Sequence, residues 1–171
     1  LHPVLREFYK ERNVVVEERR MRTDSRPIGR LIEEFLATAF VAHPYGQPGI
    51  GWPSDLASFS ATDAKRFYAE HYVPSNVTIA IVGDVDSKET LAMVEKYFAP
   101  WKGRPKPAPL RTIEPVQRVE RTIVMKDRAQ PIYIEGYHKP ASTHADDVVF
   151  GVIQDLMSRG RTSRLYRALV R

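Results

Sequence analysis

Two strand-like segments joined by a short turn constrain the fold of this chain most. Residues 118–126 and 131–138 are rich in Ile, Val and Tyr, and only the turn DRAQP separates them. Parallel neighbours need a crossover of a dozen or more residues, so these two segments can pair only in the antiparallel sense. A third strand-like segment, NVTIAIVGD, ends in a Gly-Asp turn. Together with the helical segments below, this pattern predicts an α+β fold, with a mainly antiparallel sheet backed by helices.

Six segments carry the apolar spacing or the boundary residues typical of amphipathic helices. They lie at about 3–23, 28–41, 60–72, 86–98 and 143–158, and a further helix begins near Ser163. Ser60 and Asp63 resemble a capping box, and Asp86 and Thr143 are expected as further caps. Between the second and third helices, AHPYGQPGIGWP holds three prolines and three glycines and is expected to be a structured loop.

Composition limits the chemistry that this chain can perform. Without cysteine there is no disulfide, thiolate catalysis or cysteine-bound metal, so any metal ligand would be His, Asp or Glu. No run reaches the roughly 18 apolar residues of a membrane-spanning helix, and we expect no membrane span. The net charge of +5 is dispersed among 21 acidic residues, so we expect no nucleic-acid partner. The sequence assigns no compartment.

Glu11 and Glu18 lie seven residues apart in the first predicted helix. Seven residues are almost two helical turns, so both carboxylates project from one face, about 10 Å apart along the axis. One could bind a metal ion while the other supports it, but spacing alone favours a solvated helix whose acids pair with Arg12, Arg19 and Arg22. None of the five histidines forms a pair at the spacing of a zinc motif: His2, His43, His71, His138 and His144.

Several motifs, read in order, resemble the M16 metallopeptidases, the family of insulinase, pitrilysin and the mitochondrial processing peptidase. ERNVVVEE resembles the helix that follows the family's inverted zinc motif HxxEH. AHPYGQPGIGWPSDLASFSATDAKRFYAEHYVPSNVTIAIVGDVD resembles its loop, helix and strand in sequence, and SRGRTSRLYRALVR resembles a later segment. These motifs span nearly all 171 residues.

The resemblance implies roles for two residues. Glu18 matches the third zinc ligand and Glu11 the glutamate seven positions earlier, and this spacing favours Glu18 over Glu17. The two histidine ligands and the general-base glutamate of HxxEH have no counterpart in the chain. The abrupt ends of the helical pattern further suggest that 1–171 is a fragment of one M16-like domain. In that domain about 1–110 would belong to the later part of the zinc-bearing region and about 111–171 would begin the following section.

The resemblance also implies a function. The complete enzyme would be a zinc-dependent endopeptidase that hydrolyses peptides or unfolded protein segments, in which zinc activates water and a carboxylate moves its proton. Its partners would be the peptide substrate and a second homologous domain or subunit that closes a chamber. The isolated fragment would be inactive and would not hold zinc tightly. The alternative is a non-catalytic M16-like subunit with a structural or binding role.

Overall fold

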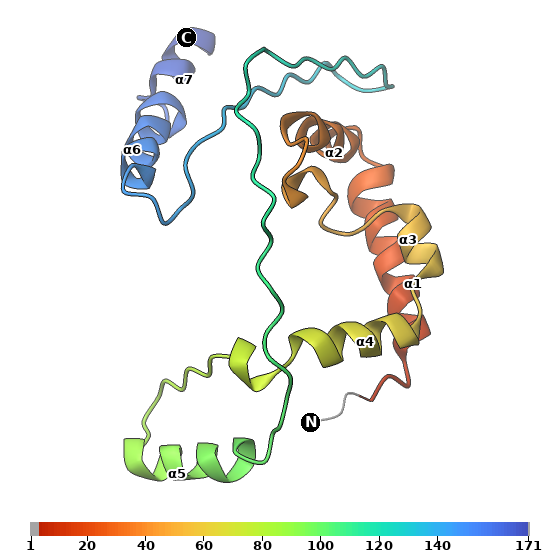
Figure 1. Cartoon of the computed structure of the whole chain (residues 1–171). Coiled ribbons are helices and arrows are strands. Elements are labelled where there is room, and N and C mark those ends of the chain that lie inside the picture. Colours follow the sequence, from red (N-terminus) through yellow and green to blue (C-terminus); the bar gives the residue numbers. More distant parts are fainter. Residues whose placement is uncertain (1–3, 171) are drawn as a thin grey trace. The chain divides into compact units, whose positions relative to one another are not determined.

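The computed structural model describes residues 4–170, and the chain divides into two compact units, Leu1–Pro131 and Ile132–Arg171 (Figure 1). Among its described residues, the first unit holds five α-helices and three shorter helical segments. They are α1 (Phe8–Arg19), a π-helix (Arg20–Asp24), α2 (Pro27–Ala39), a 3-10 turn (Pro44–Gly46), α3 (Pro53–Ser58), α4 (Ala61–His71), a 3-10 turn (Pro74–Asn76) and α5 (Ser87–Phe98).

Local sequence signals begin these helices. Pro27 and Pro53 occupy the first positions of α2 and α3, where a missing N–H costs nothing. Ser60 and Asp63 form the predicted capping box of α4, because each side chain bonds the other's backbone N–H. Asp86 caps α5 by accepting from two backbone amides at 2.9 Å each. The predicted helices at 28–41, 60–72 and 86–98 are confirmed to within about two residues.

The first helix differs from its prediction in geometry. It begins at Phe8, and from Arg20 to Asp24 it continues as a π-helix, in which Ser25 N–H donates to Arg20 O at 2.9 Å, five residues back. Helix α2 then packs close to this π-helix. An added Cβ on Gly29 would lie 2.3 Å from Arg22 O, so only glycine allows this approach.

Helix α1 is anchored to the segment around α3. The Arg12 guanidinium donates to Ala57 O at 3.2 Å and to Phe59 O at 3.1 Å. The Phe8 and Phe59 rings meet edge to face, with centroids 5.2 Å apart. The loop predicted at 42–53 leads into α3, a short helix that the sequence did not predict.

The predicted antiparallel sheet is wrong, because residues 4–170 contain no β-strand. Apart from Asn76, which ends a 3-10 turn, the residues of the three expected strands lie in no helix and no strand. Val82 (97%), Val124 (84%) and Tyr133 (83%) are largely exposed. Val, Ile and Tyr favour a pleated, half-buried surface, but a strand forms only where a neighbouring backbone about 4.8 Å away completes its hydrogen bonds. An isolated pair of strands has only marginal stability in water, so the local sequence pattern was not sufficient to form a sheet.

The second unit contains α6 (Asp147–Ser158) and α7 (Arg164–Leu169). Thr143 was wrongly predicted as the cap of the first of these helices; its N-cap is Asp146, whose side chain makes no capping hydrogen bond. The chain leaves α6 through Gly160, whose φ of +78° suits glycine. Ser163 is buried and caps α7 by accepting from Tyr166 N–H. Within the described residues, no helix is long and apolar enough to cross a membrane.

Candidate functional site

The two glutamates singled out by the sequence both lie on α1. Glu11 is exposed in the first turn, and Glu18 lies in the last turn with 37% of its side chain exposed. Glu18 Oε1 lies 2.8 Å from a guanidinium nitrogen of Arg22, one helical turn further on. This ion pair is the one that a solvated helix would make, and as an exposed pair it contributes at most about 1 kcal/mol. Glu17 is paired instead with Arg20 at 2.7 Å.

The π-helix begins two residues after Glu18. A π-helical turn is wider than an α-helical turn, and such turns occur often at functional sites. The change of geometry at Arg20 means that Glu18 lies next to a point where the helix changes its winding.

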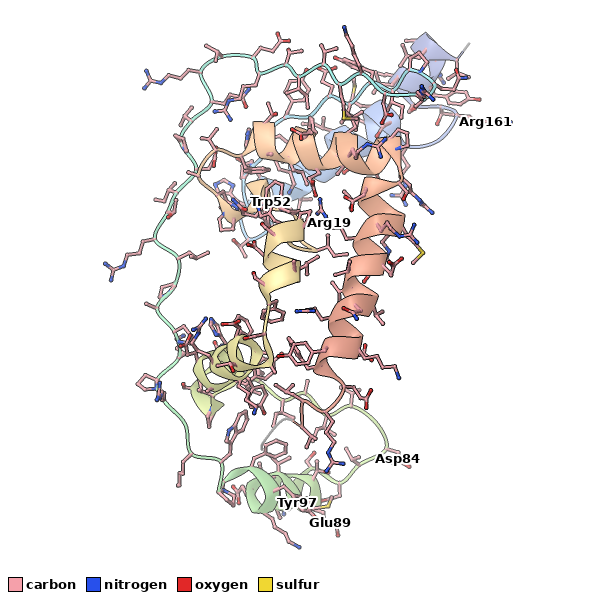
Figure 2. The ribbon with its side chains drawn as sticks, turned by 90° about the vertical axis from the view of Figure 1, so that its right-hand side faces the viewer. Arg19, Trp52, Asp84, Glu89, Tyr97 and Arg161 are labelled. Carbon is pink, nitrogen blue, oxygen red and sulfur yellow. The ribbon has the colours of Figure 1, made fainter. Side chains whose placement is uncertain are left out.

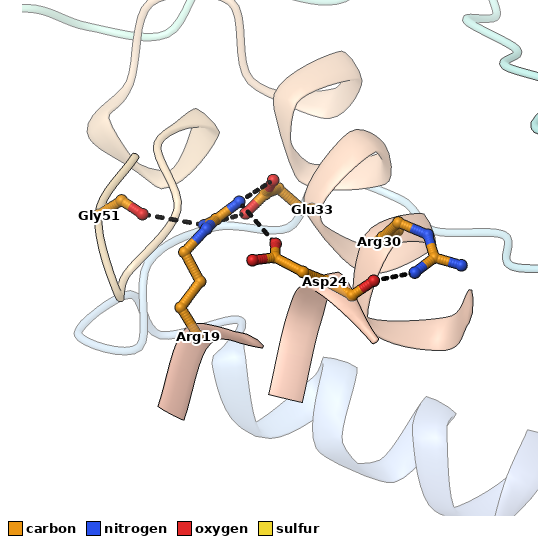
Figure 3. Close-up of polar contacts among 5 residues, drawn as sticks. All are labelled: Arg19, Asp24, Arg30, Glu33 and Gly51. Atoms are coloured by element: carbon orange, nitrogen blue, oxygen red, sulfur yellow. Dashed lines mark hydrogen bonds and ion pairs between the residues drawn. The ribbon is translucent and has the colours of Figure 1, made fainter. Parts of the chain in front are cut away.

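Arg19 is the last residue of α1, and sequence reasoning treated it only as a possible partner of surface acids. Figure 2 shows the Arg19 side chain pointing from α1 toward the segment with Trp52. Its side chain is buried, with two guanidinium nitrogens 2.8 and 2.9 Å from the two carboxylate oxygens of Glu33 on α2. The same guanidinium donates to Gly51 O at 2.9 Å and lies 3.3 Å from Asp24. Figure 3 shows Arg19 between these three groups. The hydrogen bond to Glu33 raises the pKa of Arg19.

Glu114 is a second charged residue whose structural role was not predicted from the sequence. Its carboxylate accepts from three successive backbone amides, at 2.9 Å from Val41, 2.9 Å from Ala42 and 2.7 Å from His43. These bonds, the one from Val41 foremost, lower the pKa of Glu114 from 4.5 to about 2. Arg121 donates to Thr38 O and Ala39 O at 3.0 Å each, which satisfies carbonyls at the end of α2.

The histidines serve local structure where the structure describes their contacts. His43 Nδ1 accepts from Tyr45 N–H at 3.1 Å, and the His71 ring stacks on Phe67 with centroids 4.1 Å apart, as packed residues do. The side chain of His144 is exposed, as predicted. His2 lies outside the described residues.

Within residues 4–170, no three or more His, Asp or Glu side chains gather where they could hold a metal ion. Catalytic zinc usually takes three protein ligands and leaves one position open. The described residues therefore do not form a complete zinc site.

Relatives of known name match most of the chain. A zinc protease of Helicobacter pylori named PqqE is 38% identical over 169 residues, which cover 96% of this chain and 38% of that protein. An uncharacterized zinc protease of Mycobacterium tuberculosis is 30% identical over 160 residues, 92% of this chain and 36% of the relative. The chain thus spans less than two fifths of the length of these relatives.

A solved structure agrees with the sequence matches. The crystal structure of a protease from Helicobacter pylori superposes with a TM-score of 0.80 at 35% identity, covering 99% of this chain and 42% of that one. Residues 58–171 also match the family profile described as the peptidase M16 inactive domain. The resemblance found in the motifs is confirmed: the chain belongs to the M16 peptidase family.

Proposed function

We propose that this chain is part of a zinc-dependent endopeptidase of the M16 type that hydrolyses peptides or unfolded protein segments. The observation that supports the proposal most is the match to proteins named zinc proteases, which extends over 96% of the chain. Within this endopeptidase, residues 1–171 form a portion of one M16-like domain, and about 1–110 belong to its zinc-bearing region. Peptide substrates and a second homologous domain or subunit are the expected partners.

In this proposal Glu18 supplies an anionic zinc ligand and Glu11 supports the site from the first turn of α1. Their relative placement is compatible with these roles, because both lie on one regular helix and Glu18 retains 37% exposure. The described residues bring no three possible ligands together, so we expect the chain by itself to be inactive.

A second candidate is a non-catalytic M16-like subunit with a structural or binding role. The family profile that matches residues 58–171 is described as an inactive domain, which favours this reading for that part of the chain. Glu11 and Glu18 lie outside the matched range. The two candidates differ in whether the full-length protein holds zinc.

The experiment compares the full-length protein with its Glu18→Gln and Glu17→Gln variants, measuring zinc content and peptide cleavage. The proposal expects zinc in the wild type, at least about tenfold weaker zinc binding and cleavage in Glu18→Gln, and near wild-type values in Glu17→Gln. Full zinc occupancy and activity in Glu18→Gln would show that the ligand assignment is wrong. A wild-type protein without zinc or cleavage would favour the non-catalytic subunit.

A further inference from the structure

We draw no further inference here: the strongest candidate, the exposed apolar face of α6 formed by Val148, Val149, Val152, Ile153 and Leu156, carries nothing, because no contact among the described residues shows what covers it.

Discussion

At the level of single residues, the carboxylate of Glu114 holds the loop after α2 by accepting backbone bonds from residues 41–43. Its pKa is lowered to about 2, so the stabilisation is complete above its ordinary value of 4.5 and is lost as the pH falls from there toward about 2. We expect amide hydrogen exchange at 41–43 to be slow at pH 7 and to lose protection in Glu114→Gln, whose amide group accepts fewer bonds.

The matched control for this prediction is Glu120→Gln, in the same connecting segment, whose carboxylate accepts from Thr122. It should leave exchange at 41–43 unchanged. Equal protection in Glu114→Gln and the wild type at pH 7 would contradict the role of Glu114.

The residues that sequence reasoning missed share one property, which is that their partners lie far along the chain. Glu114 bonds amides more than 70 positions away, and Arg19 pairs with a residue 14 positions away and bonds a carbonyl 32 positions away. In the sequence Arg19 stands in a run of charged residues and looks like its exposed neighbours. No local pattern distinguishes a buried arginine from a solvated one, so only the fold reveals it.

At the level of elements, the approach of α2 to the π-helix depends on Gly29. A Cβ there would lie 2.3 Å from Arg22 O and 2.8 Å from Thr23 Cα, both of them backbone atoms that do not move alone. Gly29→Ala should therefore lower the free energy of unfolding by about 1–3 kcal/mol. In an unobstructed helix the same change would stabilise by about 0.5–1 kcal/mol, so the sign of the effect is diagnostic. Denaturant unfolding measures it.

Gly49→Ala is the control for this substitution, because an added Cβ there meets nothing within 4 Å. Its effect on the free energy of unfolding should stay within about 0.5 kcal/mol. A stabilised Gly29→Ala variant would mean that the two helices are further apart than the structure shows.

Helices were predicted better than strands because their signals are local. The Ser60–Asp63 box and the Asp86 cap satisfy backbone groups within three residues, so the sequence contains both partners. A strand depends on a second backbone that the pattern does not identify. The Val- and Ile-rich segment around Val82 thus read as buried, while its side chains are exposed in the structure. The π-helix was missed for a related reason, since no residue preference distinguishes it from the end of α1.

At the level of the whole molecule, family membership was readable from the sequence although the architecture was not. The motifs for M16 peptidases recur in order along the chain, and relatives match 92–96% of it while it spans only 36–38% of their length. The candidate ligand Glu18 followed from the resemblance, because helix spacing alone favoured an ordinary ion pair with Arg22, which the structure indeed contains. The family resemblance therefore predicted a metal ligand at Glu18, whereas residue spacing predicted a surface ion pair.

Zinc retention by the 171-residue chain and by the full-length protein tests the proposed function at the level of the whole molecule. Residues 4–170 bring no three ligands together, and Glu18 is engaged by Arg22 at 2.8 Å, so the 171-residue chain has little to hold the ion. After dialysis against zinc-free buffer we expect it to retain much less than one zinc per molecule, with no difference between wild type and Glu18→Gln. Under the proposed ligand role of Glu18, the full-length protein should retain zinc in the same dialysis and lose it in Glu18→Gln, because catalytic zinc usually takes three protein ligands. Tight binding of one zinc by the 171-residue chain, abolished by Glu18→Gln, would show instead that Glu18 finds its partner ligands within this chain.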